Sequence, residues 1–344
     1  MFKRTGKNKG HTYIIAEISA NHCQNFRRAV NLIKKAKACG VDAVKFQTYT
    51  PDSLTIDHDN KYFKIRHPKW GGQTLYELYK KAYTPWKWFG RLKKAADHLG
   101  IDFFSTAFDK QAVDLLEGLN VGMHKIASFE LVDLDLIEYA AGTGKPIIMS
   151  TGMASIAEIK DAMDTARKAG AKDITLLKCV SSYPTEPEDM NLATIPDMKK
   201  RFNCSVGLSD HTLGIGVAVA AVTLGATVVE KHFTDCQSSS SPDSFFSLTP
   251  SDMRSMVDSI RTAEKSIGNV YYGISKKEKT SRVFRRSLFA VRDIKKGERF
   301  TENNIRSIRP AYGLSPKHIK KVLGKKAARN IPKGSPLKKY MIAK

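Results

Sequence analysis

Short apolar runs alternate with segments of helical periodicity along most of the chain. A β-branched run at 13–18 stops at polar residues, and apolar positions at helical spacing follow over 26–38. The same alternation predicts strands near 41–47, 101–104, 123–126, 146–149, 174–178, 206–208 and 227–229, and helices that include 85–99, 110–119 and 250–267. Eight such units in about 265 residues predict a closed (β/α)8 TIM barrel. An open, doubly wound sheet is disfavoured, because no G-x-G-x-x-G motif follows the first strand.

Two segments depart from this alternation. Residues 48–84 form a long insertion rich in His, Pro, Trp, Gly and Tyr, and loops of this length tend to be functional. Beyond residue 268 the pattern changes to a charged stretch and then to short strands and tight turns around Gly and Pro. We therefore expect a barrel domain at 1–268, a linker at 269–285 and a small mainly β domain at 286–344.

Charge and composition limit the possible classes of function. The net charge is +23, and residues 282–344 hold 19 Lys and Arg against 3 Asp and Glu. This segment has few aromatics and no nucleic-acid-binding motif, so a solvated basic surface is favoured over a nucleic-acid interface. Met1–Arg4 leads into polar residues and no long apolar run exists, which predicts a cytoplasmic protein without a membrane segment.

Polar residues follow every predicted strand. In strand order they are Glu17, Asn21 and His22; Lys45 and Gln47; Ser105 and Thr106; Lys125, Ser128 and Glu130; Ser150 and Thr151; Lys178, Ser181, Ser182 and Tyr183; Ser209, Asp210 and His211; Glu230 and His232. In a TIM barrel the carboxyl ends of the strands carry the active site. The pattern therefore predicts one composite site.

The residue types indicate which chemistry this site supports. Lys45 and Lys125 lie in apolar strands, and a buried ammonium needs an anionic partner, unless each side chain reaches solvent instead. His211 and His232 end successive strands about 5 Å apart and could share a divalent metal, although each could also be satisfied by the backbone. A phosphate and metal site without a P-loop favours condensation or aldol-type chemistry on a small phosphorylated substrate.

Several longer motifs carry a family resemblance. They are IAEISANH at 15–22, VKFQTYTPD at 44–52, LYELY at 75–79, KIASFE at 125–130, STGM at 150–153, EDMNL at 188–192, GLSDHT at 207–212 and EKHF at 230–233. Through these motifs the chain resembles the sialic acid synthase family over nearly its whole length. QTYTPD, SFE and EDMNL favour the pseudaminic acid branch of that family over the N-acetylneuraminic acid branch.

The resemblance implies a fold and an activity. Members are TIM barrels with a C-terminal antifreeze-like (SAF) domain, and they condense phosphoenolpyruvate with an amino sugar using a divalent metal, here Mn, Mg or Co. The expected reaction joins phosphoenolpyruvate to 2,4-diacetamido-2,4,6-trideoxy-L-altrose, with carbon–carbon bond formation and C–O cleavage, to give pseudaminic acid and phosphate. The alternatives are a legionaminic or N-acetylneuraminic acid synthase and, from another class, a nucleic-acid-binding protein that uses its basic C-terminal domain.

The resemblance also implies residue roles. Phosphoenolpyruvate would be bound by Lys45, Thr106, Lys125, Ser128, Ser150 and Ser209. Catalysis would use Glu17, His211 and His232, and the two histidines would be the metal ligands. The residues expected to contact the sugar are Gln47, Trp70, Gln73, Glu130, Ser181, Tyr183, Asp243 and Arg309. Arg309 would reach the barrel of a partner subunit, which implies a domain-swapped homodimer. Ser181 and Trp70 stand where the neuraminic branch has sugar-contacting asparagines, and this indicates a different sugar. The serine run at 238–241 is unusual for the family.

Overall fold

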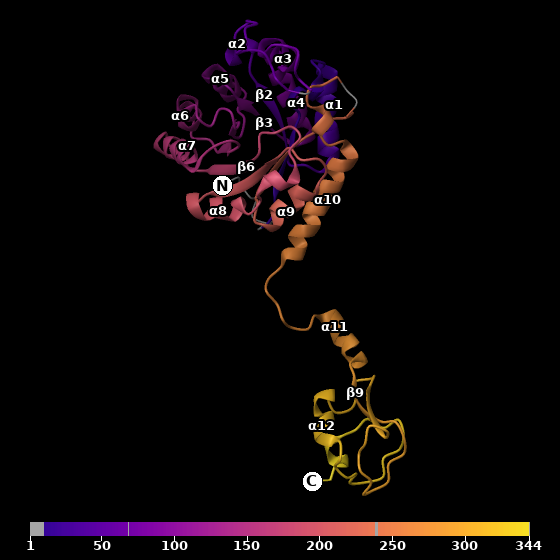
Figure 1. Ribbon diagram of the computed structural model, residues 1–344. Helices are drawn as coiled ribbons and strands as arrows, with labels where there is room; N and C mark the ends of the chain where they lie inside the picture. Colours follow the sequence, from indigo (N-terminus) through magenta and orange to yellow (C-terminus); the bar gives the residue numbers. More distant parts are fainter. Residues whose placement is uncertain (1–9, 68, 238–239, 344) are drawn as a thin grey trace. The chain divides into compact units, whose positions relative to one another are not determined.

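The computed structural model describes residues 10–67, 69–237 and 240–343, so Met1–Arg4 and the first two serines of the 238–241 run lie outside the described residues (Figure 1). The strands of the first unit are β1 (Tyr13–Glu17), β2 (Ala43–Thr48), β3 (Asp102–Ala107), β4 (His124–Ile126), β5 (Ile147–Ser150), β6 (Ile174–Cys179), β7 (Ser205–Asp210) and β8 (Val228–His232). They form a closed barrel in sequence order. The predicted TIM barrel is confirmed.

Helices surround this barrel (Figure 1). They are α1 (Phe26–Cys39), α4 (Phe89–Leu99), α5 (Lys110–Gly118), α6 (Leu134–Gly142), α7 (Ile156–Lys168), α8 (Thr194–Phe202), α9 (Gly216–Thr223) and α10 (Pro250–Ile267). Local sequence sets several of their starts: Asn25 caps α1 by accepting from the backbone N–H of Arg28, and Thr249 forms a capping box with Asp252 at α10. Apolar faces of strands and helices make one continuous buried core.

Strand register determines which polar residues meet at the carboxyl end of the barrel. All of its strand pairs are parallel, and β1 pairs with both β2 and β8. Glu17 therefore lies in register with Lys45 on one side and with His232 on the other. Side chains of adjacent strands at one level point to the same face, so these residues converge inside the barrel.

The insertion after β2 is more ordered than its composition suggests. It contains α2 (Pro51–Leu54) and α3 (Leu75–Ala82), which begin at capping boxes set by Thr50 and Thr74. An isolated bridge pairs Lys64 with Thr74. The helix predicted at 85–99 begins instead as a 3-10 turn, Trp86–Trp88, and continues as α4.

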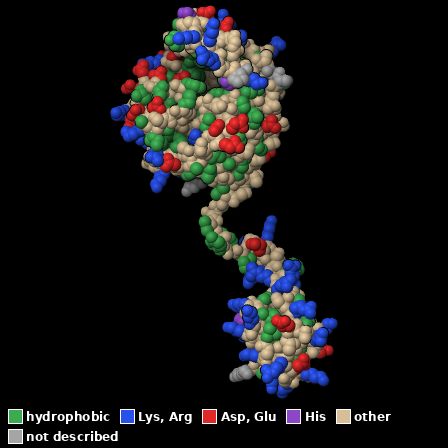
Figure 2. Space-filling model, in the orientation of Figure 1, with side chains coloured by type: hydrophobic (Ala, Val, Ile, Leu, Met, Phe, Trp, Pro, Cys, Tyr) green, Lys and Arg blue, Asp and Glu red, His purple; other side chains and the backbone are tan. Residues whose placement is uncertain are grey.

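The chain divides into two compact units, with the boundary between Gly268 and Asn269. The second unit has β9 (Ser287–Ala290) paired antiparallel with β10 (Ile305–Ile308), together with α11 (Lys276–Ser281) and α12 (Ile319–Val322). α11 lies within the stretch expected as a linker. A small buried cluster that includes Leu288, Phe300 and Leu337 holds this unit together. Lys and Arg side chains cover much of its visible surface (Figure 2).

Within the part of the chain that the structure describes, no helix is long and apolar enough to cross a membrane. Cys23, Cys39, Cys179 and Cys204 are free thiols.

Candidate active site

Glu17, Lys45 and Glu230 form a buried charged cluster at the carboxyl end of the barrel. Lys45 Nζ lies 2.7 Å from Glu17 Oε2 and 3.7 Å from Glu230 Oε1, and it donates to Thr106 Oγ1 at 2.8 Å. Burial raises the pKa of Glu17 to about 7, despite the opposing effect of Lys45. Burial alone would lower the pKa of Lys45, but Glu17 and Glu230 raise it above its ordinary value, so this lysine stays charged. The anionic partners expected for Lys45 are therefore carboxylates of the protein itself.

Lys125 is bound differently. It is buried, and its Nζ donates to Ser150 Oγ at 2.6 Å and to the carbonyl of Ile126 at 2.9 Å. Both partners are neutral, and burial lowers the pKa of Lys125. An ammonium that is held only by neutral acceptors retains a strong attraction for an anion.

Hydroxyl groups also stand at the ends of neighbouring strands. Ser128 Oγ accepts from the backbone N–H of Gly152 at 3.0 Å, and Ser209 Oγ donates to Glu230 Oε1 at 3.3 Å. A Cβ at Gly152 would lie 2.3 Å from Ser181 Oγ and 2.8 Å from Ser128 Oγ. The absence of a side chain at this glycine thus leaves room for two serine hydroxyls from different loops.

His211 and His232 face one another across the ends of β7 and β8. Their ring centroids are 5.4 Å apart. His211 Nδ1 lies 2.9 Å from the carbonyl of Val180, which can only accept, so Nδ1 carries a proton and Nε2 is the nitrogen left to bind a metal. Burial lowers the pKa of His211, but Cys179 and the bond to Val180 outweigh burial and raise it, so a metal would have to displace a proton from Nε2 near neutral pH. His232 Nδ1 is buried and has no partner among the described residues. Burial and the neighbouring His211 hold the pKa of His232 well below its usual range, so this imidazole is neutral.

This pair fits part of a divalent metal site. Neutral imidazoles with an available lone pair are common ligands of transition metals. No set of three or more His, Cys, Asp or Glu arranged to hold a metal occurs within the described ranges. Two protein ligands suit a metal whose other positions are open to water or substrate.

Aromatic side chains from three loops enclose the histidine pair. The ring of Tyr183 lies 4.3 Å from that of His211, and the ring of Phe246 lies 4.7 Å from that of His232. Trp70, from the insertion after β2, contacts Tyr183 at 5.7 Å between centroids and donates from Nε1 to the carbonyl of Pro242 at 2.9 Å. The long insertion therefore meets the loops that follow β6 and β8.

Two predicted sugar contacts already have hydrogen-bond partners in the protein. Asp243 accepts from Ser19 Oγ at 2.5 Å, which joins the loop after β8 to that after β1. Gln73 donates to the carbonyl of Trp70 at 3.2 Å and accepts from Lys81 at 2.9 Å. Gln47, by contrast, points to the charged cluster and donates to Glu17 Oε1 at 3.0 Å.

Glu130 and Ser181 retain unused polar capacity. Glu130 Oε2 and Ser181 Oγ are buried and lack hydrogen-bond partners within the described part of the chain. Burial raises the pKa of Glu130 to about 7. Arg309, the remaining predicted contact, follows β10 in the second unit and is exposed there.

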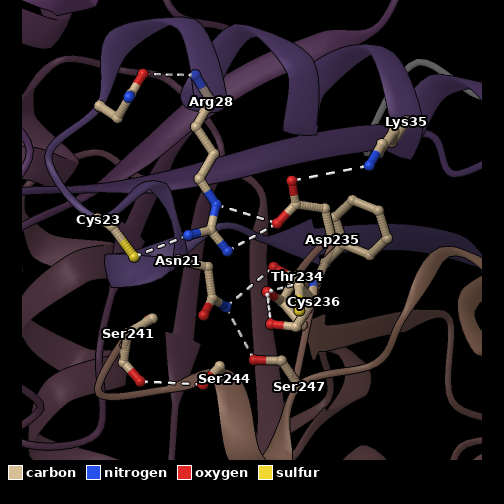
Figure 3. A network of polar contacts seen from close by, with 12 residues as sticks. Asn21, Cys23, Arg28, Lys35, Thr234, Asp235, Cys236, Ser241, Ser244 and Ser247 are labelled. Atoms are coloured by element: carbon tan, nitrogen blue, oxygen red, sulfur yellow. Dashed lines mark hydrogen bonds and ion pairs between the residues drawn. The ribbon is translucent and has the colours of Figure 1, made fainter. Parts of the chain in front are cut away.

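Two polar residues at the end of β1 have structural partners instead. His22 Nε2 lies 2.9 Å from Thr84 Oγ1 and its Nδ1 accepts from the backbone N–H of Gln24 at 3.0 Å. Asn21 donates to the carbonyl of Phe233 at 3.0 Å and to Ser247 Oγ at 2.9 Å (Figure 3). These two residues connect loops and do not face the charged cluster.

Sequence reasoning gave no site role to three residues beside the cluster. Glu230 was recognised only as a strand-end residue, although its carboxylate faces Lys45. Phe246 packs against His232, and the Phe245-Phe246 pair two residues after Asp243 is the sequence signal for it. Cys179 is a buried thiol whose Sγ lies 3.9 Å from His211 Nδ1. Its position at the end of β6 could have indicated this contact.

Comparisons with known proteins agree with this geometry. Residues 32–272 match the NeuB family, and residues 285–343 match the SAF domain. The chain is 46% identical to a pseudaminic acid synthase of Helicobacter pylori, over 94% of this chain and 96% of that protein. It is 36% identical to an N,N'-diacetyllegionaminic acid synthase of Legionella pneumophila, over 94% and 93% respectively. The crystal structure of an N-acetylneuraminic acid synthetase from Leptospira borgpetersenii superposes with a TM-score of 0.70 at 31% identity, covering 79% of this chain and 90% of that one.

Proposed function

The chain belongs to the NeuB family, and from this premise we propose that it is a pseudaminic acid synthase. It condenses phosphoenolpyruvate with 2,4-diacetamido-2,4,6-trideoxy-L-altrose to give pseudaminic acid and phosphate. The observation that carries the proposal is the higher identity to a pseudaminic acid synthase, 46%, than to a legionaminic acid synthase, 36%, over equal shares of this chain. The branch-specific motifs QTYTPD, SFE and EDMNL support the same choice.

Phosphoenolpyruvate occupies the part of the site around Lys125. Lys125 supplies a positive charge whose hydrogen-bond partners are neutral, and one of them is the hydroxyl of Ser150. Thr106, Ser128 and Ser209 supply further hydroxyl groups at neighbouring strand ends. Charge-assisted bonds from such a set suit phosphate and carboxylate oxygens. The backbone N–H of Gly152 donates to Ser128 Oγ, which leaves the proton of that hydroxyl available to bond an oxygen of phosphoenolpyruvate.

Glu17 and Lys45 act at the reacting carbons. C3 of phosphoenolpyruvate bonds to the carbonyl carbon of the open-chain sugar, and the carbonyl oxygen takes up a proton to become a hydroxyl group. Water adds at C2 and loses a proton; the C2–O bond to phosphate then breaks, the C2 hydroxyl loses its proton to give the ketone, and phosphate leaves. Glu17, with a pKa of about 7, can accept a proton from the added water, and Lys45 stabilises the resulting charge. His211 and His232 would hold a divalent metal, Mn, Mg or Co, which would polarise the sugar carbonyl when bound.

The sugar lies toward Glu130, Ser181 and the aromatic loops. Glu130 Oε2 and Ser181 Oγ are available to accept from or donate to acetamido and hydroxyl groups. Trp70, Tyr183 and Phe246 offer apolar surface to the methyl groups of a 6-deoxy, diacetamido sugar.

To test this proposal, the purified protein is incubated with phosphoenolpyruvate, Mn²⁺ and each of a panel of amino sugars, and the released phosphate is measured. We expect turnover with the trideoxy altrose sugar and little with N-acetylmannosamine. Turnover with N-acetylmannosamine alone would instead favour a neuraminic acid synthase. Salt-sensitive DNA binding without phosphate release would favour the basic C-terminal unit as a nucleic-acid-binding module.

We also propose a cytoplasmic, domain-swapped homodimer in which Arg309 of one subunit completes the sugar site of the other. Mixing Lys125→Met and Arg309→Ala proteins tests this arrangement, because each homodimer lacks one required group at both sites. Subunit exchange creates heterodimers with one intact site, so activity should rise to about a quarter of the wild-type value if partners mix randomly. Activity that stays at the level of the separate variants would contradict the swap.

A further inference from the structure

We propose that the buried ion pair between Asp210 and Lys231 positions His211 and His232, and that it thereby sets the affinity of the metal site. Each residue directly precedes one of these histidines, and the two are in register across β7 and β8. Lys231 Nζ lies 2.7 Å from Asp210 Oδ2, and both side chains are 0% exposed. The inference rests on the proposed metal role of the histidines.

The pair lies on the outer side of the barrel wall, behind the site. Successive side chains of a strand point to opposite faces. Glu230 and Ser209 contact one another on the inner face, so Lys231 and Asp210 face the helical layer. The pair therefore cannot contact a substrate inside the barrel and acts only through the backbone that carries the histidines.

Thr212 extends the pair past the end of β7. Asp210 Oδ1 accepts from the backbone N–H of Thr212 at 2.9 Å and from its Oγ1 at 2.8 Å, and Lys231 Nζ donates to the Thr212 carbonyl. His211 lies between Asp210 and Thr212, just beyond the last residue of β7. Both neighbours of His211 are thus fixed to Lys231 of β8, immediately before His232.

Stability alone does not explain a charged pair at this position. Two well-packed apolar side chains in the same place would hold the two strands together about as well, because burying charges costs solvation. Directional bonds do something that apolar contacts do not, since they fix how far one strand end lies along the other. Groups that orient metal ligands typically contribute about 10- to 100-fold in metal affinity.

Replacing both Asp210 and Lys231 by apolar residues distinguishes a role in stability from a role in positioning the histidines. Lys231→Met alone leaves Asp210 buried without its counter-charge, and we expect a clear fall in the thermal unfolding midpoint. The double variant Asp210→Leu with Lys231→Met should recover most of that midpoint. Its Mn²⁺ affinity, measured by calorimetry, should still be weaker than wild type by about 10- to 100-fold, with the KM for phosphoenolpyruvate little changed.

A matched control lies at the other end of the barrel. Lys145 Nζ is 2.8 Å from Glu117 Oε1, and the double variant Glu117→Leu with Lys145→Met should leave Mn²⁺ affinity unchanged. Should the first double variant fold poorly, Thr212→Val provides a milder test. It removes one hydroxyl bond to Asp210 and should weaken Mn²⁺ binding roughly fivefold.

The proposal also has a readout that needs no metal. In wild-type protein the bond from His211 Nδ1 to Val180 should hold one imidazole tautomer, visible in side-chain nitrogen NMR shifts. The double variant should show an averaged tautomer. Wild-type shifts and wild-type Mn²⁺ affinity in the double variant would overturn the proposal. Failure of the metal assignment itself would appear separately, as equal Mn²⁺ binding by wild type and His211→Ala.

Discussion

The two ends of the barrel are both rich in polar side chains, but they use them differently. At the amino end, Asp42 contacts His11 at 3.1 Å and Arg261 at 3.2 Å, and it also accepts from a backbone N–H at 2.8 Å. At the carboxyl end, Glu130 Oε2 and His232 Nδ1 are buried with no partner among the residues described. The Asp42 carboxylate has several hydrogen-bond partners, whereas Glu130 Oε2 and His232 Nδ1 remain available to bind a ligand.

This difference shows that unused capacity marks a functional site better than polarity does. Buried polar atoms are nearly always hydrogen-bonded in proteins, so several unpaired ones in one place indicate a missing ligand. His124 at the amino end is an instructive intermediate, because its Nε2 lies 2.8 Å from Glu117 while its Nδ1 is unpaired within the described ranges. It therefore serves as the comparison histidine in the first test below.

The largest expected effect is at the histidine pair. His211→Ala or His232→Ala should lower phosphate release by more than about 100-fold, because each change removes a proposed metal ligand. His124→Ala should retain most activity and instead lower stability, since Glu117 loses a partner. Phosphate release with circular dichroism on all three proteins checks this expectation. Comparable losses of activity in all three variants would mean that the histidines at the carboxyl end matter no more for activity than His124 at the amino end.

The lysines should give the next largest difference. Lys125→Met should reduce kcat/KM for phosphoenolpyruvate by about 100-fold, because it removes a buried charged donor whose hydrogen-bond partners are neutral. Lys145→Met at the opposite end breaks a partly exposed pair with Glu117, so kcat/KM should hardly change and stability should fall by about 1 kcal/mol or less. Steady-state kinetics over a range of phosphoenolpyruvate concentrations distinguishes the two results.

Two glutamates should respond to pH with opposite signs. Burial raises the pKa of Glu130 in the folded protein to about 7. The free energy of unfolding therefore falls as the pH rises above the pKa of this carboxyl in the unfolded chain, because the folded state resists its ionisation. Glu130→Gln should therefore increase stability at pH 8 by about 1–3 kcal/mol, with little gain at pH 4.

Although burial acts in the other direction, Lys145 and His124 lower the pKa of Glu117. Glu117→Gln should accordingly reduce stability at neutral pH, and the loss should disappear as acid protonates the wild-type carboxylate. Urea unfolding of both variants between pH 4 and pH 8 provides the measurement. If both variants changed the free energy of unfolding in the same direction at neutral pH, the charge of Glu130 would not destabilise the folded protein.

The smallest effect is expected at the rim of the carboxyl end. Trp70→Phe keeps an aromatic ring beside Tyr183 but loses the bond from Nε1 to Pro242. The KM for the sugar should rise about fivefold, corresponding to one hydrogen bond, while the KM for phosphoenolpyruvate stays the same. A rise in the KM for phosphoenolpyruvate alone would show that Trp70 acts on phosphoenolpyruvate binding and not on sugar binding.

Much of the architecture was predictable from local pattern. The alternation of short apolar runs with helical segments predicted all eight barrel strands, because strand and helix periods differ and each element buries one face. Details with weak local signals were less accurate: the helix expected from residue 85 starts as a 3-10 turn, and α11 occupies the expected linker. Propensity alone defines such ends poorly.

The sequence by itself determined which residues stand at the ends of the strands, because that depends only on order along the chain. The tertiary structure decided which of them meet, because register and the inward or outward direction of each side chain are set across strands far apart in sequence. His22 and His211 look alike in the sequence, yet the first is satisfied by Thr84 and the second faces His232. Likewise, only the folded barrel places Glu17 against Lys45 and hides the Asp210–Lys231 pair behind the two histidines.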